Sequence, residues 1–198
     1  MPAPRGRPRS FDRERALERA MQVFWRKGYE ATSVSDLTRV MDINPPSLYA
    51  AFGDKESLYL EALGRYEQDR RETLVQIVEG APTARQAIER LLRSAVRNLT
   101  QADCRGCMLS TAQCADDGLR AAIAERRATP GRELKARFDR AVRAGDLARG
   151  TDTAALAEFY ATVFIGMAIQ ARDGASRKSL AATAQAALRA WPRSAVRK

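Results

Sequence analysis

The stretch from residue 33 to residue 56 constrains the fold of this 198-residue chain more than any other part of it. Residues 33–40 and 45–52 carry apolar side chains at helical spacing, and Asp42 lies in the short break between them. Asn44 is a suitable N-cap for the second segment, and the two prolines after it occupy first-turn positions that need no N–H donor. Asp54 can cap a third, longer helix. Two short helices joined by a tight turn predict a helix-turn-helix, which places its second helix in the major groove of DNA.

Further motifs surround this stretch in a defined order. They are Phe24, Gly28 and Tyr29 at the end of the first helix, Ala31-Thr32-Ser33-Val34 at the start of the second, and Ser47-Leu48-Tyr49, Phe52 and Lys55-Glu56 from the third helix into the fourth. With these motifs, residues 10–62 resemble the DNA-binding domain of the TetR/AcrR family of bacterial transcriptional regulators. The family usually has glycine in the turn, where this chain has Asp42. Because Asp tolerates a positive φ better than most residues, we expect the turn to survive.

Almost the whole chain has the pattern of helices, and no alternation typical of a strand stands out. Together with the resemblance, this pattern predicts an all-α, TetR-like fold of about nine helices. We expect a flexible basic arm at residues 1–9, a three-helix DNA-binding domain at 10–62 and a ligand-binding and dimerisation domain at 63–198. The helices expected outside the helix-turn-helix cover residues 11–27, 55–78, 83–99, a segment starting near 107, 119–144 with a break or kink at 129–131 left open, 152–171 and 176–191.

The resemblance implies DNA-binding roles for individual residues. Ser33, Tyr49 and Lys55 are expected to contact phosphates. In the second helix of the motif, the residues expected to approach base edges are Pro46, Ser47 and Ala50. That helix carries no Arg or Lys, so we expect discrimination from thymine-methyl packing, hydroxyl hydrogen bonds and DNA shape. Packing and capping are the alternative roles for Tyr49 and Ser47. The full predicted DNA-binding set is Arg5, Arg7, Arg9, Thr32, Ser33, Ser35, Asn44, Pro45, Pro46, Ser47, Tyr49, Ala50 and Lys55.

The N-terminal arm carries a second signal for DNA binding. Arg5-Gly6-Arg7-Pro8-Arg9 resembles the core of an AT-hook, a basic, proline-stiffened segment that fits a narrow minor groove. Arginine is attracted to such a groove by its enhanced negative potential. A solubilising tail is the alternative interpretation. We therefore expect the arm to prefer A/T-rich DNA beside the major-groove site.

The net charge of +10 does not by itself identify the DNA-binding part of the chain. Residues 1–70 carry 12 Lys and Arg against 11 Asp and Glu, whereas residues 71–198 carry 22 against 13. Charge therefore supplies long-range attraction to DNA at most. No secretory signal is recognisable, and the longest apolar run, 159–169, is shorter than the roughly 20 residues that a membrane span needs. These features predict a cytoplasmic protein with no membrane partner.

Enzymatic activity is not expected. The chain contains no histidine, which removes the commonest general base and metal ligand, and it shows no phosphate-binding loop. No cofactor and no metal are predicted. The function that the sequence favours is a repressor that binds a palindromic operator as a dimer and is released by an effector. The alternative is an activator, or a basic all-α protein that binds DNA without sequence preference.

Two C-terminal segments, 152–171 and 176–191, carry apolar residues at spacings of three and four. The resemblance favours a four-helix dimer interface with two helices from each subunit, and an intramolecular core is the alternative. A two-fold dimer places two recognition helices one DNA turn apart, about 34–36 Å, and predicts a near-palindromic operator. The predicted interface residues are Leu156, Tyr160, Val163, Met167, Leu180, Ala184, Leu188 and Trp191.

The resemblance also implies an effector site in the C-terminal domain, coupled to the DNA-binding domain through the helix at 55–78. Cys107 is its sharpest feature, because a helix expected to start there, beside Arg105, would lower the thiol pKa. The Arg-Gly-Cys-Met segment resembles a subgroup of the family, some of whose members sense electrophiles or oxidants. A thiol sensor, a thiol-rich cuprous site and small buried hydrophobes are the three interpretations left open. The predicted effector-binding or sensing residues are Cys107, Cys104, Cys114, Tyr66, Met108, Gln113, Phe159, Tyr160 and Phe164.

Overall fold

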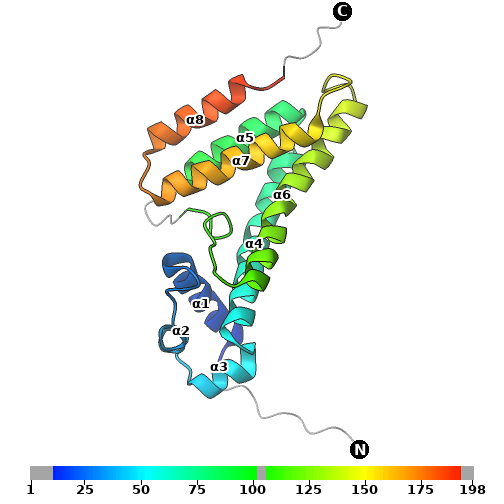
Figure 1. The fold of residues 1–198 in the computed structure, drawn as a ribbon. Coiled ribbons are helices and arrows are strands. Elements are labelled where there is room, and N and C mark those ends of the chain that lie inside the picture. The colour runs from blue at the N-terminus through cyan, green and yellow to red at the C-terminus, as the bar shows by residue number, and fades with distance from the viewer. Residues whose placement is uncertain (1–10, 102–105, 193–198) are drawn as a thin grey trace, which may run out of the picture. The chain divides into compact units, whose positions relative to one another are not determined.

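The computed structural model describes residues 11–101 and 106–192, and within them all regular secondary structure is α-helical (Figure 1). This confirms the all-α fold class, with eight helices in the described residues where about nine were predicted. The difference arises at residues 106–116, which form turns instead of a helix starting near residue 107. The helices are α1 (Arg13–Lys27), α2 (Val34–Met41), α3 (Pro45–Phe52), α4 (Lys55–Glu79), α5 (Ala84–Leu99), α6 (Asp117–Arg143), α7 (Thr153–Arg172) and α8 (Arg177–Arg189).

The chain forms two compact units, residues 1–67 and residues 68–198, and the border lies inside α4. In the N-terminal unit α1 begins at the N-cap Asp12, whose carboxylate accepts a hydrogen bond from the Arg15 N–H at 3.1 Å. Gly28 ends α1 with φ 78°, a conformation that favours glycine. The core of this unit includes Leu17, Ala20, Phe24, Leu37, Met41, Leu48, Phe52, Leu58, Tyr59, Ala62 and Leu63.

Aromatic rings join the first and fourth helices within the N-terminal unit. The Phe24 and Tyr59 rings meet edge to face with centroids 4.9 Å apart, and Tyr29 lies 5.1 Å from Tyr59. The rings of Trp25 and Tyr66 lie 5.2 Å apart. These contacts hold α1 against the start of α4, which fixes the support on which the two shorter helices pack.

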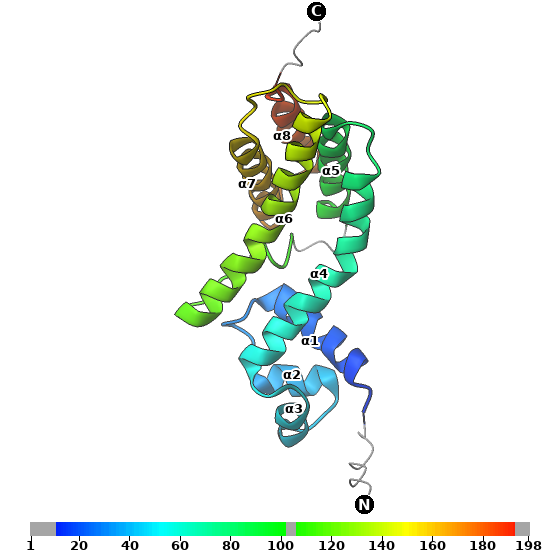
Figure 2. The ribbon, with the colours of Figure 1, turned by 90° about the vertical axis from the view of Figure 1, so that its right-hand side faces the viewer.

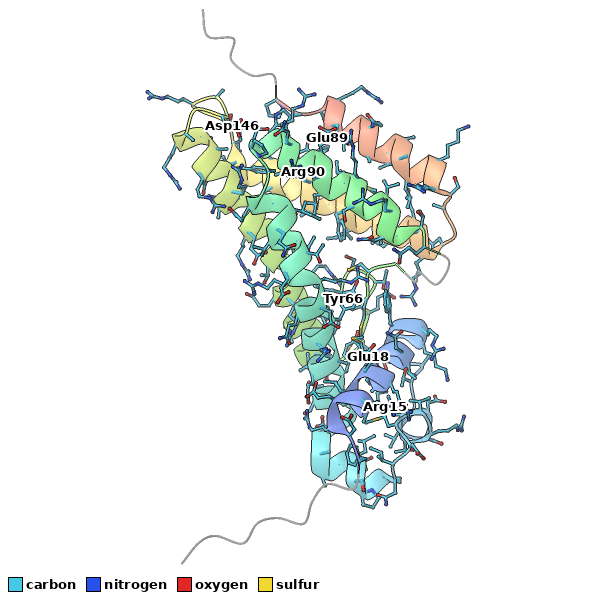
Figure 3. The ribbon with its side chains drawn as sticks, turned by 180° about the vertical axis from the view of Figure 1, so that it is seen from behind. Arg15, Glu18, Tyr66, Glu89, Arg90 and Asp146 are labelled. Atoms are coloured by element: carbon cyan, nitrogen blue, oxygen red, sulfur yellow. The ribbon has the colours of Figure 1, made fainter. Side chains whose placement is uncertain are left out.

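The C-terminal unit comprises the end of α4 from residue 68 and α5 to α8, with α5, α7 and α8 packed side by side (Figure 1). Phe138, Tyr160 and Trp191 form its aromatic centre, each ring within 6.5 Å of the other two. The helix α6 runs unbroken through Pro130, so the break left open at 129–131 does not occur (Figure 2). At the start of α5, the Asp146 carboxylate accepts the Ala84 N–H at 2.6 Å, and the nearby Arg90 donates to the Gly80 carbonyl (Figure 3).

By length and composition alone, α7 is the one helix in the described chain that is long and apolar enough to cross a membrane. Its contacts with α5, α6 and α8 instead make it a packed helix of the C-terminal unit. One side of α7 is buried in these contacts. The opposite side keeps large apolar side chains at the surface, and Phe159 and Ile169 are 40 % and 44 % exposed. An exposed apolar helix face of this kind is typical of an interface between proteins.

Candidate nucleic-acid interface

The turn between α2 and α3 has the geometry that the sequence predicts. Asp42 ends α2 in the left-handed conformation, with φ 58° and ψ 48°, and it is the only non-glycine residue with positive φ in the described chain. Asn44 then caps α3, because its side-chain oxygen accepts the Ser47 N–H at 2.8 Å. Asp42 therefore takes the place of the glycine that the family usually has, and α3 starts immediately after the turn.

One face of α3 is buried and the other is open. Leu48 and Phe52 lie in the core, whereas the Tyr49 side chain is 50 % exposed. Pro45, Pro46 and Ala50 are exposed beside Tyr49, and Ser47 is half-buried. These residues form the outward surface of the helix, which consists of an aromatic hydroxyl, one serine hydroxyl and small apolar groups. Such a surface offers hydrogen bonds to phosphates and apolar contacts to thymine methyl groups.

The start of α2 is fixed by a reciprocal capping box. The Ser33 hydroxyl accepts the Asp36 N–H at 3.0 Å, and the Asp36 carboxylate accepts the Ser33 N–H at 3.2 Å. Lys27 reaches the same carboxylate at 3.0 Å. The hydrogen bond from Lys27, followed by those from Ser33, lowers the pKa of Asp36 to about 2. Ser33 and Ser35 remain exposed, as the predicted contacts with DNA require.

Thr32 does not face the solvent. Its side chain is 1 % exposed, and its hydroxyl donates to the Gly28 carbonyl at 2.6 Å. The Thr32 side chain therefore closes the end of α1 inside the unit and is not available for the predicted contact with DNA. The neighbouring Ser33 is the N-cap, so the two hydroxyls that follow each other in the sequence have opposite orientations.

Lys55, which the family resemblance places at a phosphate, and Arg13 of α1 are both engaged within the N-terminal unit. Lys55 donates to the Thr32 carbonyl at 2.9 Å, and its ammonium lies 4.2 Å from the centroid of the Tyr29 ring. Arg13 pairs with Glu61 at 2.5 Å, and this hydrogen bond raises the pKa of the Arg13 guanidinium. The guanidinium of Arg13 also stands over the Phe52 ring, which belongs to α3, at 4.4 Å.

Sequence reasoning missed Arg39. It is the only Lys or Arg between residues 28 and 54, and it is exposed in the last turn of α2. Ser35 lies four residues earlier, on the same side of the helix. Within the described N-terminal unit, Arg15 and Arg39 are the cations that make no ion pair or hydrogen bond inside the unit. The position of Arg39 as the single cation inside the helix-turn-helix was the available signal.

The cysteine segment in the C-terminal unit differs from the prediction. Cys107 is buried beside a run of turns, and the helix that was predicted to start there is absent. Cys114 is half-buried, and its thiol donates to the Asp116 carbonyl at 3.5 Å. The two thiols are free rather than joined. Cys104 and the arm residues Arg5, Arg7 and Arg9 lie outside the described residues.

Contacts from two helices hold the turns around Cys107. Gly106 has φ 75°, and a Cβ at this position would lie 2.6 Å from the Ala168 carbonyl oxygen of α7, so only glycine fits. From α6, the Arg127 guanidinium donates to the Ala112 carbonyl at 2.8 Å and to the Leu109 carbonyl at 3.2 Å. The segment is thus held by side-chain hydrogen bonds from α6 and lies in close approach to the backbone of α7, which the sequence pattern did not predict.

The other predicted effector residues are distributed over both units. Tyr66 packs on Trp25 in the N-terminal unit, Met108 is buried and Gln113 is exposed. Tyr160 is a core residue whose hydroxyl donates to the Ala187 carbonyl at 3.1 Å, and burial raises its pKa to about 12. Phe164 is half-buried. A groove of about 390 Å³ contains only Phe159 of the predicted set, and it is lined by Thr151, Asp152, Ala155, Leu156, Phe159, Ala190 and Pro192.

The predicted dimer interface also needs correction. Most of its residues are already buried within one subunit, so they have almost no surface left for a partner: Leu156, Tyr160, Met167, Leu180, Ala184 and Trp191. Val163 and Leu188 remain half-exposed. The exposed apolar residues of α7 are instead Ala155, Phe159 and Ile169. The first two lie one position before the predicted interface residues Leu156 and Tyr160.

Residues 16–62 match the family model for bacterial regulatory proteins of the tetR family. Over 194 residues the chain is 34 % identical to the HTH-type transcriptional repressor ComR of Escherichia coli K12, covering 95 % of this chain and 92 % of ComR. The chain belongs to the TetR family. It is also 31 % identical to the E. coli repressor BdcR over 90 % of this chain and 88 % of BdcR.

A solved structure of a TetR-family regulator extends the likeness to a DNA complex. The chain is 44 % identical to CifR, a cysteine mutant of which was solved with a 26-base-pair double-strand operator, at a TM-score of 0.89 over 94 % of this chain and all of that one. The reduced form of E. coli NemR, at 17 % identity and a TM-score of 0.78, shares the fold. This TetR-family chain is thus a DNA-binding transcriptional regulator, which confirms the function predicted from the helix-turn-helix.

Family membership also indicates the class of protein. Members of the family are regulators of transcription rather than enzymes, and they act on DNA. Within the described residues, no group of three or more His, Cys, Asp or Glu side chains is arranged to hold a metal ion.

Proposed function

We propose that this protein is a cytoplasmic repressor that binds a near-palindromic operator as a homodimer and leaves it when an effector or a thiol-reactive compound acts on the C-terminal domain. The observation that carries the proposal is the outward face of α3, where Tyr49 and small apolar side chains are exposed beside the half-buried Ser47. The likeness to CifR, which was solved on operator DNA, and to the repressors ComR and BdcR supports it.

In this proposal, residues 10–62 read the operator. Tyr49 and Ser33 bind phosphates on either side of the major groove, and Ser47 and its exposed neighbours on α3 contact base edges. We add Arg39 to this set, because it is the exposed and unengaged cation of the helix-turn-helix. The arm at residues 1–9 enters the adjacent minor groove. Without a cation on α3, specificity comes from methyl contacts and DNA shape rather than from a guanine-binding arginine.

In this proposal, residues 63–198 form the dimerisation domain, and the dimer interface includes the exposed apolar face of α7. Phe159 and Ile169 are large apolar residues that a second copy of the chain would cover. Gly166 lies between them with open space where a Cβ would stand, which permits a close approach of two helices. A two-fold arrangement through this face makes the two reading helices equivalent and explains why the operator should be palindromic.

The effector site is proposed at the turns that contain Cys107. The Cys107 thiol is buried, so adding any group to its sulfur requires the packed turns around it to move. Because these turns contact α6 and α7, modification of the thiol would also displace both helices. CifR, the relative at 44 % identity, was itself solved on operator DNA as cysteine mutants. A reversible ligand that occupies the C-terminal unit is the second candidate effector.

The experiment that tests the proposal is capture of genomic DNA fragments by the purified protein, followed by sequencing. It is run in reducing buffer and again after mild diamide treatment. One short palindrome supports a specific regulator, and its loss on oxidation with retention by Cys107→Ser supports thiol sensing. Capture that is unaffected by oxidation favours a reversible ligand instead. Diffuse capture without a motif contradicts the operator-specific proposal and favours a nonspecific DNA-binding protein.

A second assay separates a repressor from an activator. The captured fragment is cloned upstream of a reporter gene, and transcription is measured with and without the protein. Lower transcription in the presence of the protein supports repression. Higher transcription contradicts repression but leaves the operator-binding part of the proposal intact.

A further inference from the structure

The last turn of α3 contains no basic residue of its own, although the negative end of a helix dipole favours a cation there. At this end the Tyr49 carbonyl accepts the Gly53 N–H at 2.9 Å. The Ala51 carbonyl belongs to the group of C-terminal carbonyls that a helix leaves unpaired. It accepts hydrogen bonds from Arg13 of α1, from Nη2 at 3.2 Å and from Nε at 3.4 Å. The cation at the end of α3 is thus supplied by another helix.

The same guanidinium is bound to α4 through a bidentate ion pair. Nη1 and Nη2 of Arg13 donate to the two carboxylate oxygens of Glu61 at 2.5 and 2.7 Å. Two parallel bonds of this kind fix the plane of a guanidinium as well as its position. The guanidinium carbon also lies 4.4 Å from the centroid of the buried Phe52 ring, at the end of α3. The Arg13 and Glu61 side chains are 26 % and 35 % exposed, so water screens this pair less than one at the open surface.

The position of α3 depends on such contacts, because a helix of eight residues is not stable by itself in water. Leu48 and Phe52 bury its inner face, but the hydrophobic effect is non-directional and does not define how far the helix slides or turns. Hydrogen bonds are directional and do define it. Arg13 makes such bonds to the last turn of α3, and Glu61 determines where its guanidinium lies.

We propose that Arg13 and Glu61 are positioning residues for DNA reading. The pair holds the C-terminal end of α3 against α1 and α4, and it thereby sets how Ser47 and Tyr49 meet the major groove. In this role neither side chain has to touch the DNA. The inference rests on the proposed function of α3 as the reading helix. It is independent of the effector, the dimer interface and the operator sequence.

The sign of one substitution separates positioning from simple electrostatics. Glu61→Gln removes a negative charge from the DNA-binding unit and releases the Arg13 guanidinium, so attraction alone predicts tighter binding to the captured fragment. Positioning predicts an affinity about tenfold lower, because the charged hydrogen bonds that orient Arg13 are lost. Affinity of the purified full-length protein is measured by fluorescence anisotropy, for the captured fragment and for a random duplex of equal length. Unchanged or tighter binding of Glu61→Gln to the captured fragment would overturn the inference.

Arg13→Met should lower the ratio of captured-fragment to random-duplex affinity about tenfold, since a displaced α3 loses base contacts while general attraction to DNA remains. Arg15→Met is the matched control. It removes the same charge from the same helix, at an exposed side chain that makes no ion pair or hydrogen bond inside the described N-terminal unit. Equal losses of the ratio in the two variants would contradict positioning.

Two further measurements on Arg13 exclude a direct phosphate contact and a folding artefact. A cation that neutralises a phosphate contributes about 0.9 to the slope of log affinity against log salt concentration, so positioning predicts an unchanged slope in Arg13→Met. Arg13→Lys covers the case in which Arg13→Met folds poorly. Lysine keeps the charge but lacks the fork that reaches Glu61 and Ala51 together, so the affinity ratio should still fall. A slope reduced by about 0.9, or a wild-type ratio in Arg13→Lys, contradicts the inference.

Hydrogen exchange distinguishes a local effect on α3 from a general loss of stability. The Gly53 amide, which donates to the Tyr49 carbonyl, should exchange faster in Arg13→Met. The Asp36 amide at the start of α2 should keep its wild-type rate. In a double-mutant cycle, Arg13→Met and Glu61→Gln should be non-additive in affinity for the captured fragment. Equally faster exchange at both amides, or additive effects, would contradict positioning. If no specific site is captured, the proposed function fails, while the exchange result still tests Arg13.

Discussion

At the scale of single residues, the role of a side chain near α2 depends on its conformation and its contacts more than on its residue type. Asp42 takes a left-handed conformation that costs most residues energy, and it allows the N-cap of α3 to follow two residues later. Thr32 and Ser33 are chemically alike, but one hydroxyl closes α1 and the other caps α2. Lys55 and Arg13 are cations in a DNA-binding unit, and both are occupied by rings and oxygens of that unit.

A substitution at Asp42 tests the turn. Asp42→Val should lower the free energy of unfolding by about 1–2 kcal/mol, because a β-branched residue tolerates the left-handed region poorly. Asp42→Gly should keep or slightly raise stability, since glycine adopts a positive φ without strain. Urea denaturation followed by circular dichroism measures both. Equal stability of the valine and glycine variants would show that the turn adopts another conformation.

The capping box of α2 predicts an acid-sensitive contribution to stability. The pKa of Asp36 is lowered to about 2 from the ordinary 3.8, so its stabilising effect is complete above about pH 4 and is lost as the pH falls toward 2. Asp36→Asn should therefore be less stable than the wild type at neutral pH, and the difference should vanish near pH 2. Lys27→Met removes the largest cause of the shift and should move the loss to higher pH. Thermal melts across this pH range measure both effects.

At the scale of elements, the turns at residues 106–112 are held by neighbouring helices in addition to their own hydrogen bonds, such as that from the Thr111 N–H to the Cys107 carbonyl. Arg127 of α6 donates to the carbonyls of Leu109 and Ala112, and the Ala168 carbonyl of α7 leaves no room for a side chain at Gly106. A guanidinium that binds two carbonyls fixes a loop at little entropic cost, because its donors are rigidly arranged. Movement of α6 and exposure of Cys107 are therefore expected to occur together.

Removal of this arginine tests the coupling. Arg127→Met should raise the rate at which iodoacetamide alkylates Cys107 severalfold, because three hydrogen bonds that hold the buried turns are lost. Mass spectrometry of the Cys107 peptide measures the rate. Arg120→Met is the control, since Arg120 lies on the same helix but pairs only with its neighbour Asp117. Equal rates in the two variants would mean that Arg127 does not restrict access to the thiol.

At the scale of the whole molecule, charge and apolar surface are distributed unevenly along the chain. Most of the excess positive charge lies after residue 70, outside the DNA-reading helices. The exposed apolar face of α7 also lies in the C-terminal unit. An apolar face of this kind favours association with a second copy, and a dimer doubles the number of reading helices without any change in them.

Charged substitutions on α7 test the dimer. Phe159→Glu and Ile169→Glu should each weaken self-association at least about tenfold, because both place a charge in an apolar contact. Val75→Glu is the matched control, since Val75 on α4 is 43 % exposed, as Phe159 and Ile169 are at 40 % and 44 %. Sedimentation equilibrium measures the association. Dimers of unchanged affinity in both α7 variants would place the interface elsewhere on the molecule.

The helices, most of their caps and the helix-turn-helix could be predicted from the order of residues alone. Asn44, Asp42 and Gly53 act on residues at most four positions away, so their roles follow from the local chain. The outward positions of α3 followed from the same periodicity, because the helix is short and has one buried face.

Contacts between distant segments settled which side of α7 is buried, where the Lys55 ammonium goes and how the turns around Cys107 are held. A helix with apolar residues on most of its circumference has no single apolar face in its sequence, so packing against α5, α6 and α8 chooses the buried side. Nothing in the sequence around Lys55 indicates that its ammonium will contact the Tyr29 ring and the Thr32 carbonyl. These outcomes arise only when the chain has folded, because local propensity does not encode long-range contacts.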